Sequence, residues 1–345
     1  MKKNNKSGKR KLKKILIIIL SSLCGAALLY AAFCLFAGPL FYPDFYKKSE
    51  KLCKIPGLSE GFIPQGVTSF EGSSDVIICG YMQNGSNSRI YIVKDGKETV
   101  KILLSREDGS VYKGHAGGVT AAGDYLYVSN ASKIFVLDKN AVLSAKDGDT
   151  VSFSGSFPVS CRSSFCSSDG QYLYVGEYHA EGYETDASHV IKTSDGGENA
   201  AFVYAYALSA GGEYGLADHS SPDFVVSVCD EVQGFAFLSG ARIVLSCSSG
   251  LSDSVLRSYD ASGDPDGTVD GIPLLILDGK RHVEDMKMPH MSEDIEFRGT
   301  RLMVGFEAGA RKYGSGLLPF SVRSVTEITM PDPGSSVKPD LRNPG

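Results

Sequence analysis

The feature that most constrains the fold is a pattern of three short β-type runs that recurs along the chain. In residues 115–138, a short run (118–121) reaches a turn at 123–124, and a run of alternating aromatic and aliphatic residues (125–128) follows it. A second turn then leads to a third run, 133–137. Short apolar runs separated by Gly, Asp, Asn and Ser are typical of antiparallel strands joined by tight turns. This stretch is therefore predicted to be an up-and-down β-meander.

Four further copies of the pattern give five repeats. A small residue closes the second strand of each copy, at spacings of 49, 47, 70 and 59 residues: Gly80, Ser129, Gly176, Ser246 and Gly305. A fourth, outer strand is predicted before each following repeat, for example in residues 99–104, 157–160 and 224–228. The third strand of the last repeat has a weak pattern and is placed near residues 311–313.

Four short strands per repeat, at a period near 40–50 residues, indicate a β-propeller. The sequence predicts an all-β propeller of five blades over residues 51–332. Six blades is the alternative, because the long third and fourth repeats have room for a further group of strands. Residues 51–57 resemble the outer-strand segment 285–289, so we expect them to complete the last blade and close the ring. Residues 333–345 are predicted to be a disordered tail.

One long apolar segment precedes the repeats. Residues 15–37 form a run of 23 residues without a charge, long enough for a helix to cross a hydrocarbon layer of about 30 Å. Eight basic residues and no acidic one lie in residues 1–14, which predicts a cytoplasmic N-terminus and an extracellular propeller. A cleaved signal peptide is the rival interpretation, but its apolar core is usually shorter. We therefore expect an uncleaved, single-pass signal anchor in the plasma membrane, joined by a linker, residues 38–50.

Charge is distributed unevenly along the chain. The whole sequence has 35 basic and 40 acidic residues, and without residues 1–14 the balance is 27 basic to 40 acidic. An acidic body repels nucleic-acid phosphates, so no nucleic-acid partner is expected.

The openings of the repeats carry a resemblance to a known group. The tripeptides QGV (65–67), GGV (117–119) and QGF (233–235) precede second strands of the LYV type. In these features, over about residues 51–332, the chain resembles the bacterial lactonase-like and quinoprotein-like propellers. The resemblance implies the fold. It leaves the activity open, because that broad group includes calcium-dependent lactonases and esterases, redox enzymes and plain binding proteins.

Polar residues cluster where a propeller would place one mouth of its channel. First strands line the channel, and the loops before them and after the second strands share that mouth. The predicted ligand-binding residues are Gln65, His115, Asn130, Glu177, His179, Gln233, His290, Glu293, Asp294 and Glu307. Arg162, Tyr81, Tyr178 and Ser248 hold comparable positions. Convergent polar groups at a ring mouth are a default ligand site, although water alone also keeps such mouths polar.

Asp294 stands where the other repeats have Gly66, Gly118, Ser164 and Gly234. A carboxylate there, beside Glu293, is a candidate ligand of a divalent cation such as calcium. The structural alternative is that Asp294 caps a backbone amide or pairs with an arginine.

Three functions remain open at this point. The one we favour is a ligand- or protein-binding module at the cell surface, whose mouth takes a small molecule, a glycan or a protein. The second is a metal-dependent lactonase or other hydrolase, and the third is an envelope scaffold. The sequence holds no G-x-S-x-G elbow, phosphate-binding glycine loop, H-E-x-x-H or C-x-x-C motif, which favours binding over catalysis. Six cysteines follow the apolar segment and allow disulfides of undetermined pairing.

Overall fold

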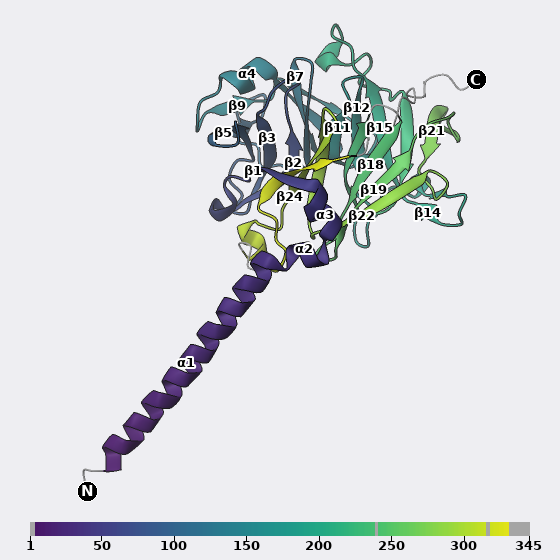
Figure 1. The fold of residues 1–345 in the computed structure, drawn as a ribbon. Helices are drawn as coiled ribbons and strands as arrows, with labels where there is room; N and C mark the ends of the chain where they lie inside the picture. The colour runs from purple at the N-terminus through teal and green to yellow at the C-terminus, as the bar shows by residue number, and fades with distance from the viewer. Residues whose placement is uncertain (1–3, 239–240, 315–317, 331–345) are drawn as a thin grey trace.

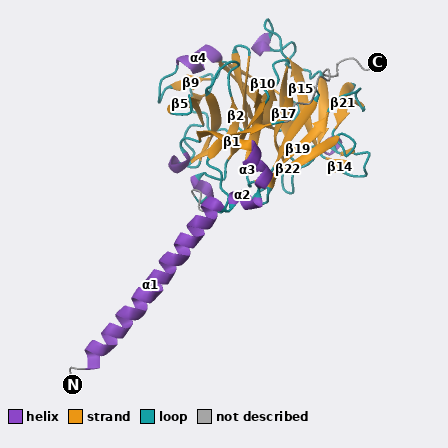
Figure 2. Cartoon of the chain, in the orientation of Figure 1, coloured by secondary structure: helices purple, strands orange, loops and turns teal. Residues whose placement is uncertain are grey.

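The computed structural model describes residues 4–238, 241–314 and 318–330, and its strands form five radial blades (Figures 1 and 2). The first blade comprises β2 (Phe62–Thr68), β3 (Val76–Met82), β4 (Arg89–Lys94) and β5 (Glu98–Ser105), with β9 (Thr150–Ser152) outside β5. The second comprises β6 (Gly118–Ala122), β7 (Tyr125–Asn130), β8 (Lys133–Asp138) and β10 (Gly155–Pro158). The helix α4 (Lys139–Ser144) lies between β8 and β9 in the chain.

The third and fourth blades hold the long repeats. Blade 3 comprises β11 (Ser163–Ser168), β12 (Tyr172–Glu177), β15 (Ala201–Ala207) and β16 (Phe224–Val228). Blade 4 comprises β17 (Val232–Leu238), β18 (Arg242–Cys247), β19 (Ser254–Asp260) and β22 (His282–Met288). The surplus length of the third repeat forms the small hairpin β13 (Ile191–Lys192) and β14 (Glu198–Asn199). That of the fourth repeat adds β20 (Gly267–Val269) and β21 (Ile272–Ile276) to the edge of blade 3. Neither set of extra residues forms a further blade, since β13–β14 is a separate two-stranded sheet and β20–β21 widen blade 3, and the five-blade prediction is confirmed.

The fifth blade closes the ring. It comprises β23 (Ser292–Arg298), β24 (Arg301–Phe306), β25 (Ser324–Thr329) and, from the other end of the propeller sequence, β1 (Ser49–Lys54). The predicted closure by the N-terminal segment is thus confirmed. The predicted third strand near residues 311–313 is wrong, because Arg311–Tyr313 forms a 3-10 helix and the third strand is β25. The long connection between β24 and β25 carries no alternating pattern that would have indicated this.

The core is divided among the five gaps between neighbouring blades, each of which holds its own buried hydrophobic cluster. Both faces of a blade are therefore buried, which explains why the second strands are apolar on both sides. Small residues at the ends of these strands permit close packing. An added Cβ on Gly80 would lie 2.1 Å from the backbone oxygen of Ile63, and one on Gly176 would lie 2.0 Å from the ring of Phe165.

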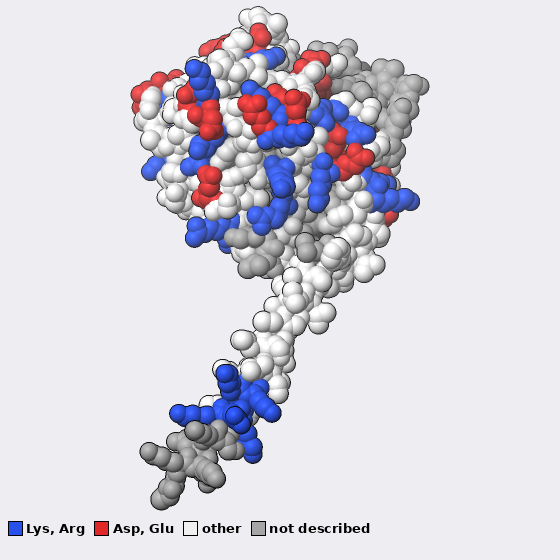
Figure 3. Space-filling model, turned by 60° about the vertical axis from the view of Figure 1, so that its left-hand side comes forward, with Lys and Arg blue, Asp and Glu red and all other residues white. Residues whose placement is uncertain are grey.

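The N-terminal segment forms one long helix that leads up to the propeller. The helix α1 (Asn4–Phe36) projects away from the blades, and its Lys9–Cys34 stretch is long and apolar enough to cross a membrane (Figure 1). Basic side chains gather towards its free end, and the part next to the propeller carries no charge (Figure 3). Two short helices follow it, α2 (Gly38–Phe41) and α3 (Pro43–Lys48).

The segment 38–50, expected as a linker, is folded against the blades. Phe45 of α3 is 1% exposed and meets Phe306 of blade 5 edge-on, with ring centroids 5.9 Å apart. The hydroxyl of Tyr42 donates a 2.6 Å hydrogen bond to Asp253 in the loop after β18. Phe320, in the connection between β24 and β25, packs on Phe33 of α1 at 5.6 Å. These contacts tie one end of the propeller, where the second strands finish, to the end of α1.

Candidate functional site

One mouth of the channel gathers polar side chains from blades 1, 2 and 5. The inner strands begin and the second strands end at this edge, as the pairs Phe62 with Met82 and Ser292 with Phe306 show. It is the same end to which α1 is tied, so we call it the anchor-side mouth. Its connected polar residues form the mouth cluster: Gln65, Tyr81, His115, Glu293, Glu307, Lys312 and Tyr313.

Two carboxyl groups form the centre of the mouth cluster. Glu293 is the second residue of β23, Glu307 directly follows β24, and their side chains are hydrogen-bonded to each other. Burial, and then the neighbouring Glu307, raise the pKa of Glu293 well above its usual range, and burial also raises the pKa of Glu307. Two carboxyl groups in contact, one buried and one half-buried, disfavour each other's ionisation, so the pair holds a proton more readily than two isolated glutamates do.

Neighbours from blades 1 and 5 fix the orientation of this acid pair. The side-chain amide of Gln65 donates a 3.1 Å hydrogen bond to Glu307 Oε2, and the hydroxyl of Tyr313 is also bonded to Glu307. The electrostatic effect of Lys312 and these bonds oppose the rise in the pKa of Glu307. The hydrogen bonds from Gln65 and Tyr313 therefore fix the orientation of the Glu307 carboxyl group beside Glu293.

Lys312 extends the cluster to blade 2. Its Nζ donates a 2.9 Å hydrogen bond to the hydroxyl of Tyr81, whose ring stacks on His115 with centroids 4.7 Å apart. Desolvation by the surrounding mouth residues, and then Lys312, lower the pKa of His115 below its usual value, although the residue itself is exposed at the rim of the mouth; this imidazole is therefore mostly neutral at physiological pH. Asn130 accepts the backbone N–H of His115 at 2.8 Å, which positions the histidine.

Asp294 lies in the middle of the channel, away from solvent. Its carboxylate accepts the backbone N–H groups of Val119 at 3.3 Å and Ile295 at 3.1 Å, together with that of Val67. These donors come from blades 2, 5 and 1, so one side chain ties three inner strands together. Burial and the nearby Glu296 raise the pKa of Asp294 well above its usual range. The contacts correspond to the amide-capping alternative for this residue.

The remaining predicted residues lie around the cluster. Glu177 Oε1 is 2.5 Å from Nδ1 of His189 and also accepts the N–H of Phe202. His179 Nδ1 is 3.0 Å from the hydroxyl of Thr185, within the same excursion of blade 3. His290 is 6% exposed, and its Nε2 is buried without a hydrogen-bond partner. Gln233 is half-buried on β17. The structure thus joins Gln65, Glu293 and Glu307 directly and connects His115 and Asn130 to them through Tyr81 and Lys312, and it leaves the others beside this cluster.

The predicted cation ligands do not converge as a metal set does. Within residues 4–238, 241–314 and 318–330, no group of three or more His, Cys, Asp or Glu side chains is arranged to hold a metal ion. The carboxylate of Asp294 is engaged by amides, and Glu293 is bonded to Glu307. A calcium ion at this mouth would therefore depend on Glu293 and Glu307, with the amide oxygen of Gln65 as a further oxygen ligand.

A pocket of about 690 Å³ opens at the opposite end of the channel, where the hairpins between first and second strands meet. We call it the distal pocket, and residues of all five blades line it, among them Phe70, Ala121, Gln171, Phe237 and Glu296. Glu296 binds the hydroxyl of Thr68 through Oε1, whereas its buried Oε2 has no partner. Burial raises the pKa of Glu296 to about 8.

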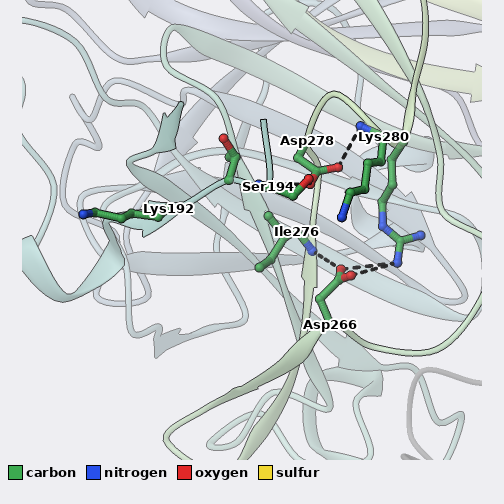
Figure 4. Close-up of a pocket in the computed structure, with 8 residues that line it drawn as sticks. Lys192, Ser194, Asp266, Ile276, Asp278 and Lys280 are labelled. Carbon is green, nitrogen blue, oxygen red and sulfur yellow. Dashed lines mark hydrogen bonds and ion pairs between the residues drawn. The ribbon is translucent and has the colours of Figure 1, made fainter. Parts of the chain in front are cut away.

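A third hollow lies at the outer edge of blade 3, far from the channel axis (Figure 4). Here the excursions of the third and fourth repeats meet, with Ser194 bonded to Asp278. Asp266 accepts the N–H of Ile276 at 2.8 Å and pairs with Arg281 at 3.3 Å, as Figure 4 shows. Asp278 thus joins the two excursions, and Asp266 holds the fourth-repeat excursion to itself.

Sequence reasoning missed Lys312, Tyr313 and Glu296. The first two were assigned to a strand, although a basic residue and a tyrosine shortly after Glu307 could have indicated a loop that folds back over the mouth. Glu296 lies two residues after Asp294 on β23 and therefore faces the same channel. The two-residue period of a strand could have indicated this from the sequence.

Comparisons with known proteins do not identify a function for the chain. No known protein family matches the chain, and no curated protein does. Among solved structures, it is similar to the PQQ-bound aldose sugar dehydrogenase from Streptomyces coelicolor (14% identity, TM-score 0.41, covering 81% of this chain and 96% of that one). It is also similar to BamB from Moraxella catarrhalis (11%, 0.33, 78% and 85%) and to glutaminyl cyclase from Myxococcus xanthus (10%, 0.37, 80% and 97%). At such identities and TM-scores these likenesses carry no argument, and the five-bladed propeller rests on the strand pairing of this chain itself.

Proposed function

We propose that this protein is a membrane-anchored β-propeller that binds a small polar ligand at the membrane surface, through its anchor-side mouth. The observation that carries the proposal is the mouth cluster, which connects hydrogen-bonding groups of blades 1, 2 and 5 at one point. Gln65 meets Glu307, and Tyr81 meets Lys312, across separations of 242 and 231 residues, so these groups come together only in the folded ring. Convergent polar groups in a concave setting are the usual form of a ligand site.

The chemistry of the cluster favours a hydroxyl-rich ligand such as a glycan. Tyr81 and His115 supply flat ring surfaces, on which the C–H face of a sugar packs well. Glu307 and Gln65 supply acceptors and donors for its hydroxyl groups, and the neutral His115 adds no competing charge.

The proposed location follows from the N-terminal segment. The apolar stretch of α1 would cross the membrane, and the basic residues before it would keep the N-terminus in the cytoplasm. The propeller would then lie on the outer side, with the anchor-side mouth towards the lipid surface. Phe320 supports this arrangement, because the connection that carries Lys312 also packs on α1.

Hydrolysis is the second candidate function, and the acid pair is the observation that favours it. Glu293 and Glu307 are hydrogen-bonded and both have raised pKa values, and carboxyl pairs of this kind serve as acid and base in several hydrolytic sites. Such a reaction would use the ionised partner as base and the protonated one as acid. A divalent cation at the same carboxylates would belong to this alternative.

The test is thermal unfolding of the full chain in detergent, with mono- and oligosaccharides, amines, Ca²⁺ and Zn²⁺ as probes. A ligand present at 100 times its dissociation constant stabilises a fold by about 2.7 kcal/mol, which is a measurable shift. Glu307→Gln is the site variant, and Glu296→Gln, at the other end of the channel, is its matched control. We expect a probe to raise the Tm of the parent and of Glu296→Gln, each against its own ligand-free state, and not that of Glu307→Gln.

Three results would redirect the account. A shift lost only in Glu296→Gln would assign the ligand to the distal pocket. A Tm that falls with chelator and recovers with one ion would favour the hydrolase. Indifference to every probe would contradict small-ligand binding and leave the mouth as a contact surface for a protein, as in a scaffold.

A further inference from the structure

Two cysteine side chains from neighbouring blades lie in contact beside the anchor-side mouth. The sulfur atoms of Cys229 and Cys247 are 3.8 Å apart. Cys229 directly follows β16, the outer strand of blade 3, and Cys247 ends β18, the second strand of blade 4. The thiols of Cys79, Cys161 and Cys166 lie instead against backbone carbonyl groups.

The backbone around the pair is suited to a covalent bond. Cys247 is paired with Val232 in the ladder of blade 4, and Cys229 is joined to Val232 by the short turn at residues 230–231. Glu231 adopts a left-handed conformation with φ 63°, and its carbonyl accepts the N–H of Ser248 at 2.8 Å. The turn thus holds Cys229 against the end of β18, and rotation of the two side chains would close the remaining gap between the sulfur atoms.

The two thiols differ in a way that gives each a role in thiol–disulfide exchange. Cys229 is half-buried and therefore reachable, whereas Cys247 is 7% exposed. The hydrogen bond with Cys247 and the guanidinium group of Arg257 on β19 lower the pKa of Cys229, while that hydrogen bond and burial raise the pKa of Cys247. A thiolate attacks faster than a thiol, so Cys229 is the attacking residue and Cys247 the second one.

We propose that Cys229 and Cys247 form a redox-active pair that closes into a disulfide between blades 3 and 4. The oxidant is a low-molecular-weight disulfide such as oxidised glutathione. The Cys229 thiolate attacks one of its sulfur atoms, a mixed disulfide forms, and one glutathione thiolate leaves. Cys247 then gives its proton to solvent and attacks the sulfur of Cys229, which releases the second glutathione. Two protein thiols are oxidised, and one small disulfide is reduced to two thiols.

The bond would stiffen one side of the anchor-side mouth. It closes a loop between residues 18 positions apart in sequence, which contains β17 and its hairpin with β18. The turn inside this loop also donates the N–H of Glu231 to the carbonyl of His179, in the excursion of blade 3. Oxidation would therefore fix the His179 segment and the loop after β18 relative to each other. This inference stands whether or not the mouth binds a glycan.

The experiment treats the folded full chain in detergent with oxidised glutathione, alkylates the remaining thiols after unfolding, and maps the peptides by mass spectrometry. We expect a linked peptide containing Cys229 and Cys247, with Cys79, Cys161 and Cys166 recovered as alkylated thiols. Because closing a loop restricts the unfolded chain, the oxidised protein should melt roughly 5 °C or more above the reduced form. Dithiothreitol should reverse both changes.

Two single variants separate the proposed pair from incidental oxidation. Cys229→Ser should lose the linked peptide and the rise in Tm, and Cys247→Ser should stop at a mixed disulfide of Cys229 with glutathione. Cys53→Ser, in blade 5, is the control and should behave as the parent does. Recovery of both cysteines as alkylated thiols after oxidation, or a stable glutathione adduct on Cys229 in the parent, would overturn the proposal. Cys229→Ser replaces a half-buried thiol, so the test does not depend on Cys247→Ser folding.

Discussion

Single buried carboxyl groups do different work along the channel, although they stand close together in sequence. The carboxyl group of Asp294 accepts hydrogen bonds from backbone amides of three strands, which makes it a structural residue. Glu293, one position earlier, turns to the anchor-side mouth, and Glu296 faces the distal pocket. Successive side chains of a strand point in opposite directions, and the register shift between Ser292 and Ile295 alters that alternation locally. Small differences in position therefore decide which carboxyl group can meet a ligand.

Glu296 makes stability depend on pH. Its pKa is about 8 in the folded protein and 4.5 as the ordinary value, so the folded state holds the proton more tightly. The stabilisation is complete below the ordinary pKa and is lost as pH rises through 8. We expect the Tm to be higher at pH 5 than at pH 8. Glu296→Gln should reduce that difference, as thermal unfolding across this range would measure. An equal pH dependence in parent and variant would contradict the assignment.

The small residues that close the second strands are not equivalent. A Cβ on Gly80 would meet the backbone oxygen of Ile63 at 2.1 Å, whereas one on Gly305 would meet the nearest atom at 3.6 Å, an ordinary contact. Gly80→Ala should therefore destabilise the fold by about 2 kcal/mol or more through forced backbone movement, and Gly305→Ala should cost less than about 1 kcal/mol. Chemical denaturation of the two variants measures this, and equal costs would show that blade 1 can shift freely.

At the scale of elements, the strands could be predicted from local sequence patterns, whereas pairing between strands distant in sequence could not. The second strands and the outer strands β5, β10 and β16 were predictable because apolar runs and turn residues mark them directly. The positions of β20 and β21 were not, because they pair with blade 3 although they belong to the fourth repeat. The same reason hid the partners of Asp294, whose amide donors lie on blades far apart in sequence.

The candidate site was predictable in part for a related reason. Gln65, His115 and Glu293 were found because the ring symmetry of a propeller places their strand positions at one mouth. Lys312 and Tyr313 belong to a connection that is not part of the repeat pattern, so the ring symmetry could not be used to predict their positions. The sequence also could not show that α3 packs on blades 4 and 5.

The packing of α3 gives a prediction at this scale. Phe45 is 1% exposed and contacts Phe306, so Phe45→Ala should lower the free energy of unfolding by about 3–5 kcal/mol. Leu40→Ala, at an 81% exposed position of α2, is the matched control and should change it by less than about 0.5 kcal/mol. Denaturant titration in detergent checks both variants. Equal stabilities would mean that α3 is only loosely attached.

At the scale of the whole molecule, the apolar helix α1 is connected to the propeller through folded segments. The apolar helix, the two short helices and the closing strand β1 follow each other without a break, so the anchor is joined directly to the strand that closes the ring. A ligand bound at the anchor-side mouth would lie between the propeller and the lipid surface. The proposed membrane arrangement would limit the partners to molecules that reach the lipid surface.

The proposed topology makes its own prediction. Alkaline phosphatase, which needs an oxidising compartment, should be active when fused after residue 345, and a fluorescent protein that matures in the cytoplasm should be bright when fused before residue 1. The cause is the excess of basic residues in residues 1–14. Replacing these basic residues by glutamine should weaken the preference. An inactive C-terminal phosphatase with full expression would contradict an extracellular propeller.

The measurement that tests the central claim most directly is the distance of each channel mouth from the lipid surface. Asn84→Cys, in the exposed loop after β3, and Glu71→Cys, in the exposed hairpin before it, place a fluorophore at opposite ends of blade 1. The full chain is reconstituted in vesicles whose lipids carry a nitroxide quencher on the head group, and the parent treated alike gives the background. The account predicts strong quenching of the label at residue 84 and weak quenching at residue 71. Equal quenching, or the reverse order, would contradict a ligand mouth that faces the membrane.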